Sequence, residues 1–294
     1  MYTSVADQTT DQLGGPLSVL VRQKRDHVKL DALMEQLRGT TGEEQAAVLL
    51  RIYRLVFPHA FAEESVLWPV MRRVLPDGGD LTLEVEREYQ EVNELVRRLE
   101  GLDDGSPERA DVLGRLTEVL DDDVRDEEDA LFPRLQARVS RRELQVLGVL
   151  WEVVRRIAPT RAHPVVARRP PGNVVAALPL SVLDRLRDVV DRGVLTAPNA
   201  ITPALHHASS ALARASHAVE LLPIMRSGED PSTRYIAAQG KGGGGPHRFG
   251  RRVARRRGGP GGAEGGLAAG APSVTSPRRT ARVWRHVSGR CVLG

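Results

Sequence analysis

The chain has 294 residues, of which 41% are hydrophobic and 27% are charged, so it can bury the core of one or two globular domains. Its only cysteine is Cys291, which excludes a disulfide framework and a thiolate metal site. A membrane span requires about 18 consecutive apolar residues without a charge, and the sequence contains no such run. The first residues also lack the apolar core of a signal peptide. We therefore expect a soluble, cytoplasmic protein with no membrane partner.

The net charge of +4 combines two unlike parts of the chain. From Lys241 onward, 12 Lys and Arg residues accompany the single acid Glu264, whereas the preceding residues contain 30 basic and 37 acidic side chains. The high isoelectric point therefore reflects a basic C-terminal tail, and the body of the protein is acidic.

Apolar side chains in the first 160 residues recur at intervals of three and four, the spacing of a buried helix face, so we expect an all-α fold. The first helix is expected over about 16–37, with His27 inside its apolar stripe, and two glycines end it. The second is expected over about 43–75, with His59 and Glu63 in its stripe. The prolines of this second segment predict a kink or an early end.

Two further helices follow a turn rich in Pro, Asp and Gly. One is expected over about 81–99, and Tyr89 lies on its apolar face. The other is expected over about 108–139 and carries Asp123 and Glu127 within its apolar stripe. The polar residues thus fall at core positions in four successive helices.

The second and fourth helices contain the same phrase at an offset of 64 residues. Residues 59–69 match residues 123–133 in a doubled Glu, a Leu, an aromatic residue and a Pro. The first and third helices match more weakly at an offset of 62, which aligns His27 with Tyr89. A duplicated helical hairpin is the simplest explanation, and two such hairpins form an antiparallel four-helix bundle.

The candidate metal ligands are the polar residues that interrupt the four apolar stripes: His27, His59, Glu63, Tyr89, Asp123 and Glu127. His59 and Glu63 are four positions apart and project from one helix face, as do Asp123 and Glu127. Acids that point into one core without a partner are costly to bury and repel each other. A bound cation removes this conflict, and paired carboxylates with imidazoles are the donors of two-metal sites in helical bundles.

Each candidate ligand has a simpler explanation when it is taken alone. A single histidine such as His27 is more often a surface or core residue than a ligand, and Tyr89 alone is more often core packing. Asp123 and Glu127 lie in the acidic run 121–129, a pattern also expected of a solvated helix face. The repeat favours the joint interpretation, because chance does not place both polar pairs in one register before the same Leu, aromatic and Pro.

Residues 17–159 resemble the hemerythrin-like HHE cation-binding family, most specifically through residues 59–69 and 127–133. In that family a duplicated helical hairpin supplies a His from the first helix and a His-x-x-x-Glu from the second, and the same set again from the third and fourth. The resemblance implies a non-haem, di-iron centre in the middle of the bundle.

The resemblance also implies a role for individual residues. His27 and His59 would be terminal ligands of one iron, and Glu63 and Glu127 would be the bridging carboxylates. Glu63 and Glu127 stand at equivalent places in the two copies of the repeated phrase.

The chain departs from the family pattern in its second half, with Tyr89 and Asp123 where the family has His. Phenolate and carboxylate oxygens still bind hard cations, and they favour ferric over ferrous iron. Reversible oxygen transport needs a diferrous resting state, so we expect peroxide, nitric-oxide or oxygen chemistry, or iron sensing, instead. The alternative is a degenerate bundle with one metal or none that serves as a protein-interaction scaffold. The sequence selects no substrate and does not decide whether the protein is an enzyme.

A fifth helix is predicted to open at Ser140, because Glu143 three residues later completes a capping box. Beyond it, prolines indicate an extended linker, and shorter amphipathic helices are expected near 181–190 and 203–222. The predicted organisation has four parts: a metal-binding bundle (16–158), a Pro-rich linker (159–179), a short helical extension (180–226) and a basic tail (240–294).

The tail is rich in Gly and Arg and poor in apolar residues, so we expect it to be disordered. Its charge predicts only non-specific binding of nucleic acid, since it has few aromatic side chains for stacking on bases. A frame-shifted end of a GC-rich reading frame predicts the same composition.

Overall fold

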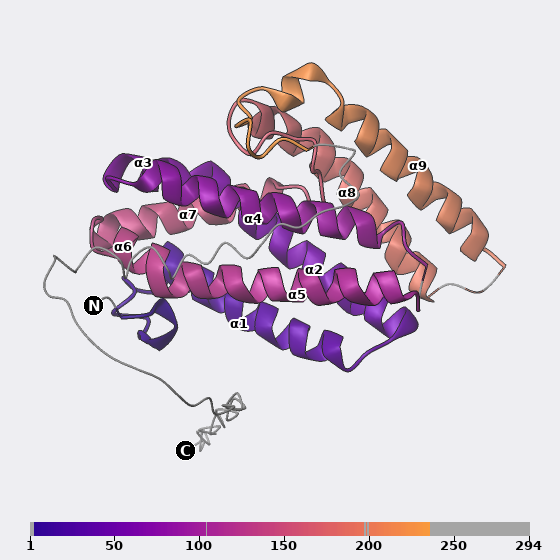
Figure 1. Ribbon diagram of the computed structural model, residues 1–294, viewed down its shortest axis with the longest axis horizontal. Helices are drawn as coiled ribbons and strands as arrows, with labels where there is room; N and C mark the ends of the chain where they lie inside the picture. The colour runs from indigo at the N-terminus through magenta and orange to yellow at the C-terminus, as the bar shows by residue number, and fades with distance from the viewer. Residues whose placement is uncertain (1–2, 104, 197, 199, 236–294) are drawn as a thin grey trace, which may run out of the picture. The chain divides into compact units, whose positions relative to one another are not determined.

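The computed structural model describes residues 3–103, 105–196, 198 and 200–235, and in these residues all regular structure is helical (Figure 1). The all-α prediction is confirmed. Within the described residues, no helix is long and apolar enough to cross a membrane. The predicted disorder of residues 240–294, and their predicted binding of nucleic acid, lie outside the described residues.

Two helical hairpins form the bundle (Figure 1). α1 (Val19–Arg38) packs against α2 (Gly42–Ala62), and α4 (Gly78–Leu99) packs against α5 (Pro107–Asp126). Contacts between α1 and α5 join the hairpins. The short loops within each hairpin make its two helices antiparallel, as the repeat predicted.

Serine side chains fix where several of these helices begin. Ser18 accepts a hydrogen bond from the Leu20 N–H at the start of α1. Ser140 and Glu143 form the predicted capping box at the start of α7 (Arg141–Ile157). Such caps satisfy N–H groups that have no partner within the helix.

α7 is the predicted fifth helix, and it packs on α1, α2 and the turn after α2. Its apolar face inserts Trp151, which is fully buried. Gly148 lies against the start of α1, where an added Cβ would stand 2.0 Å from the Leu17 carbonyl oxygen. The absence of a side chain at Gly148 therefore sets how closely α7 approaches the bundle.

Both repeated phrases contain a π-helical turn, and the sequence pattern did not predict it. α2 continues through η2 (Glu63–Leu67) into α3 (Trp68–Val74), and α5 continues through η3 (Glu127–Leu131) into α6 (Phe132–Gln136). The helices expected over 43–75 and 108–139 are therefore each interrupted at the same place. A proline follows each turn and has no N–H to continue the α-helical ladder. π turns are rare, and many lie at functional sites.

The C-terminal part is more helical and more tightly packed than a linker. α8 (Gly172–Thr196) begins inside the range 159–179 and packs on α9 (Thr202–Glu220), which precedes the short η4 (Pro223–Arg226). α9 agrees closely with the helix expected near 203–222, whereas α8 is much longer than the helix expected near 181–190. Prolines usually interrupt a helix, but Pro171 stands just before the first turn of α8, where no N–H is needed. The division into four parts remains a prediction.

Candidate metal centre

The structure places all six predicted ligands in the core between the hairpins. They come from four helices and from the first residues of the two π turns, and none is more than 5% exposed. Their positions are as follows: His27 on α1, His59 on α2, Glu63 in η2, Tyr89 on α4, Asp123 on α5 and Glu127 in η3.

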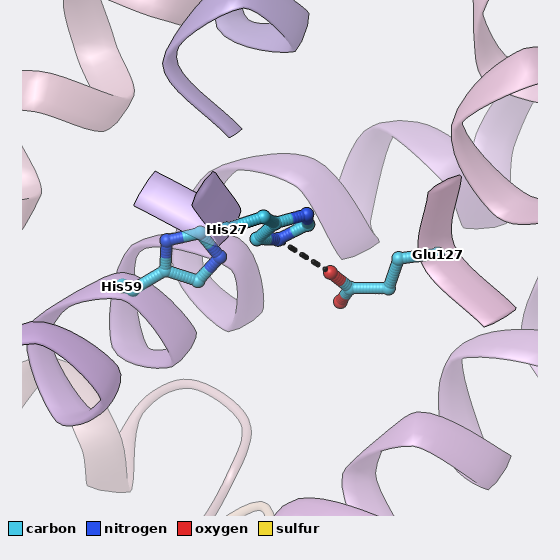
Figure 2. A group of neighbouring side chains, drawn as sticks. All are labelled: His27, His59 and Glu127. Atoms are coloured by element: carbon cyan, nitrogen blue, oxygen red, sulfur yellow. Dashed lines mark ion pairs between the residues drawn. The ribbon is translucent and has the colours of Figure 1, made fainter. Parts of the chain in front are cut away.

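Three of the six offer ligand atoms to one point. One ligand atom from each of His27, His59 and Glu127 lies within 4.8 Å of the other two, and the described residues contain no other such group (Figure 2). His27 Nε2 is 3.2 Å from Glu127 Oε2, and the two imidazole ring centres are 5.2 Å apart. Two imidazoles and a carboxylate are a donor set suited to non-haem iron.

Glu63 connects this group to the second half of the repeat. Its Oε1 is 3.1 Å from His59 Nε2, and its Oε2 accepts a hydrogen bond of 3.0 Å from the Tyr89 hydroxyl. Glu63 therefore lies between a ligand predicted for one metal and a ligand predicted for the other.

Asp123 stands at a small cavity next to these groups. Apolar side chains of α1, α2 and α5 line this cavity together with five polar residues: Asp26, His27, His59, Tyr89 and Asp123. The Asp123 Oδ1 atom is buried without a hydrogen-bond partner, as are both carboxylate oxygens of Glu127 and Oε1 of Glu63. Glu127 Oε2 is within ion-pair distance of His27, but neither Glu127 oxygen has hydrogen-bond geometry. Buried carboxylate oxygens in this state are costly unless a cation or a proton compensates them.

The acidic side of the centre binds protons more tightly than usual. Burial and the negative charge of Glu63 raise the pKa of Glu127 to about 7. The pKa of Asp123 is raised well above its usual value by burial and by the charges of Glu127, Glu88 and Glu63. The pKa of Tyr89 is also raised, by burial and by the charges of Glu63, Asp123 and Glu127. A cation at this place would replace these protons and relieve the repulsion.

The two histidines behave in the opposite way. Burial lowers the pKa of His27, but its contacts with Glu127 and Glu128 outweigh this and raise it to about 10. Burial lowers the pKa of His59 as well, but the charge of Glu63 and the contact with Asp26 outweigh burial and raise this pKa to about 9. Two cationic imidazoles compensate only part of the acidic cluster. The residues present therefore fit a bound metal ion.

Two carboxylates of the centre were missed by the sequence analysis. Glu128 Oε1 is 3.0 Å from His27 Nδ1, and Asp26 Oδ2 is 3.5 Å from His59 Nδ1. Each imidazole thus has a carboxylate at Nδ1 and directs Nε2 toward a predicted bridging Glu. Both acids are sequence neighbours of predicted ligands, and Glu128 belongs to the doubled Glu of the repeat, which was a usable signal.

Aromatic side chains enclose the two imidazoles. Phe132 stacks on His27 with ring centres 6.1 Å apart, and Trp151 of α7 meets His59 edge-on at 5.3 Å. Both aromatic residues are fully buried, so they separate the histidines from solvent.

Comparisons with known proteins relate part of the chain to a cation-binding family. Residues 19–135 match the family model described as Hemerythrin HHE cation binding domain. A protein of Schizosaccharomyces pombe named "Uncharacterized hemerythrin-like protein" is 25% identical over 171 residues, which cover 57% of this chain and 84% of that protein. A DNA nickase of Nostoc sp. is 28% identical over 138 residues, which cover 47% of this chain but only 38% of the nickase. No solved structure matches the chain. Residues 19–135 therefore form a hemerythrin-like HHE cation-binding domain.

Proposed function

We propose that this domain holds a non-haem di-iron centre that serves peroxide, nitric-oxide or oxygen chemistry, or iron sensing, rather than oxygen transport. One observation carries the proposal: the buried oxygens of Glu63, Asp123 and Glu127 converge without enough positive charge to balance them. A cation-binding domain supplies that charge by binding metal.

The donor atoms divide into two unequal halves. His27, His59 and Glu127 suit the first iron, as two imidazoles and a carboxylate. Asp123 and Tyr89 are oxygen donors that suit the second, harder ion. We propose that Glu63 and Glu127 bridge the two ions. An iron pair held by these residues would supply redox chemistry toward a small molecule that contains oxygen or nitrogen.

The chain's own residues account for the proposed preference against oxygen transport. Two anionic oxygen donors in place of imidazoles stabilise the ferric state, which does not bind oxygen reversibly. Apolar residues of the cavity wall, among them Leu30, Leu55 and Leu120, limit the water beside the centre. Without metal, the Tyr89 hydroxyl keeps its proton and gives it to a hydrogen bond with Glu63.

Metal analysis of the chain purified from iron-rich medium tests the proposal. We expect two irons per chain, and we expect His59→Ala to lose most of this iron. His206→Ala is the matched control, because His206 is an exposed histidine of α9. One iron per chain would reject the di-iron centre, and no iron together with no thermal stabilisation by added metal would reject the metal function.

The second candidate function is a protein-interaction scaffold with one metal or none. Tyr89 and Asp123 favour it, because they stand where the resembling family has His. In that case His59→Ala is neutral or mildly stabilising, since no cation is lost. The match to the DNA nickase adds no third candidate, because it spans only 38% of that protein. Turnover of peroxide and of nitric oxide by the iron-loaded protein separates an enzyme from a sensor.

A further inference from the structure

α7 lies outside the segment 19–135 that matches the family model, yet two of its side chains reach the candidate metal centre. Trp151 meets the His59 ring edge-on, and the Arg155 guanidinium lies 5.3 Å from the centre of the Trp151 ring. Arg155 Nη2 is also 2.9 Å from Asp26 Oδ2. The fifth helix therefore contacts His59 both directly and through Asp26.

Asp26 is held as a buried anion between these groups. Only 3% of it is exposed, and its Oδ2 is 3.5 Å from His59 Nδ1. Cationic side chains contact its carboxylate on two sides, with Arg155 Nη2 2.9 Å from Oδ2 and Arg25 Nε 3.3 Å from Oδ1. The side chain of Arg25 is 55% exposed and that of Arg155 only 20%, so solvent screens Arg155 less.

We propose that Arg155 is a positioning residue of the metal centre, which holds Asp26 so that its carboxylate fixes the His59 ring with Nε2 directed at the metal. A carboxylate at the far nitrogen of a metal-bound imidazole sets the orientation of the ring and raises its basicity. The inference rests on the proposed function only in that His59 binds metal. It adds a contribution of α7, a helix outside the matched domain.

The His27 side of the centre offers an internal comparison. Glu128 occupies the place at His27 Nδ1 that Asp26 occupies at His59. Among the described residues, no Lys or Arg forms an ion pair with Glu128. A cationic side chain therefore positions the carboxylate at His59 but not the one at His27. Loss of Arg155 should change the orientation of the His59 ring and leave that of His27 unchanged.

A purely structural role for Arg155 would be to fasten α7 to α1. Loss of such an anchor would lower thermal stability without a specific effect on His59. A positioning role instead predicts a change at His59 Nδ1 and a weaker metal site in a protein that remains folded.

Three variants separate these roles: Arg155→Gln, Arg155→Lys as the conservative rescue, and Arg156→Gln as the control. Arg156 is the next residue of α7, its side chain is 73% exposed, and within the described part of the chain its only ion pair is with Glu152. The first measurement uses the metal-free protein, where ¹⁵N-edited spectra report the Nδ1–H protons of His27 and His59 and their exchange with water. The second is titration with Co²⁺ followed by its visible absorption.

With Arg155→Gln we expect the His59 Nδ1–H signal to shift and exchange faster while that of His27 is unchanged. Affinity for Co²⁺ should fall by about 10- to 100-fold. Arg155→Lys should restore part of both effects, and Arg156→Gln should change neither. An unchanged His59 signal or an unchanged affinity in Arg155→Gln would overturn the inference. If the wild-type chain binds no Co²⁺, the proposed metal function fails, and the His59 signal alone decides whether Arg155 positions the ring.

Discussion

The Tyr89 hydroxyl donates a 3.0 Å hydrogen bond to Glu63, a residue of the opposite hairpin. Both side chains are buried, so this bond joins the two halves of the repeat inside the candidate metal centre. Tyr89 stands at the position equivalent to His27. Its hydroxyl donates a hydrogen bond to a carboxylate, whereas His27 offers a ring nitrogen as a candidate metal ligand. Its behaviour therefore reports whether the second half of the centre is filled.

Tyr89→Phe should lower the stability of the metal-free protein, because Glu63 loses a buried hydrogen bond. We expect a loss of about 1 to 3 kcal/mol in the free energy of unfolding, measured with urea. In the ferric protein, Tyr89 as a ligand should give a visible phenolate-to-iron band that disappears in Tyr89→Phe. A ferric protein without such a band, or one in which the Phe variant retains it, would show that Tyr89 is not a ligand.

Metal uptake should release protons and should strengthen as the pH rises. The pKa values of His27 and His59 are raised to about 10 and 9, so both imidazoles carry a proton at pH 7 that a metal must displace. Affinity for Co²⁺ should therefore increase between pH 7 and pH 9. Proton release in weakly buffered solution checks this directly, and His59→Ala should release fewer protons. A pH-independent affinity would contradict the prediction.

The second pH effect concerns His163, a buried residue that forms ion pairs with both α8 and α9. Its Nε2 is 3.0 Å from Asp184 of α8, and its Nδ1 is 2.9 Å from Glu220 of α9. Burial lowers the pKa of His163, but these two carboxylates outweigh burial and raise it to about 9. Because the folded pKa exceeds the unfolded value of about 6.5, the stabilisation is complete below pH 6.5 and is lost as the pH rises through 9.

The wild-type protein should therefore be more stable to unfolding than His163→Asn at about pH 6, and this difference should disappear by about pH 9.5. The difference in unfolding free energy should shrink by at most about 3 kcal/mol over this range. Urea unfolding at the two pH values measures it, with His206→Asn as an exposed control that should show no such change. A constant difference would mean that His163 is not charged in the folded protein.

Gly148→Ala should separate α7 from the bundle. The new Cβ would stand 2.0 Å from the Leu17 carbonyl oxygen, so backbone must shift, at a cost of about 1 to 3 kcal/mol. Gly114→Ala is the matched control, because among the described residues nothing beyond the helix's own backbone lies within 4 Å of a Cβ added there, and the helix should gain about 0.5 to 1 kcal/mol. Thermal unfolding compares the two, and equal effects would contradict the close approach at Gly148.

The sequence predicted the bundle and the burial of its polar residues because both depend on local periodicity. The helix face that contains His59 and Glu63 repeats at Asp123 and Glu127, and the structure buries all four in the core. The start of α7 was predictable for the same reason, since a capping box is a local signal. These features need no knowledge of distant contacts.

The parts that the sequence did not predict depend on contacts between distant segments or on a local alternative that periodicity does not distinguish. Arg155 of α7 and Asp26 of α1 meet where these two helices pack together, although they lie far apart in the chain. The packing of residues 158–167 depends on partners such as Asp184 of α8, which accepts the backbone N–H groups of Thr160 and Arg161. The prolines that follow Glu63 and Glu127 indicate only a kink or an early end of the helix, and they do not distinguish a π turn from other interruptions.

The matching π turns bear on the history of the molecule. One extra residue in an ancestral hairpin, copied when the hairpin was duplicated, explains both turns with a single insertion, whereas separate insertions require two. The insertion is then older than the duplication. The ancestor would have been a hairpin that paired with a second copy of itself, and its polar cluster would have lain on the symmetry axis of that pair.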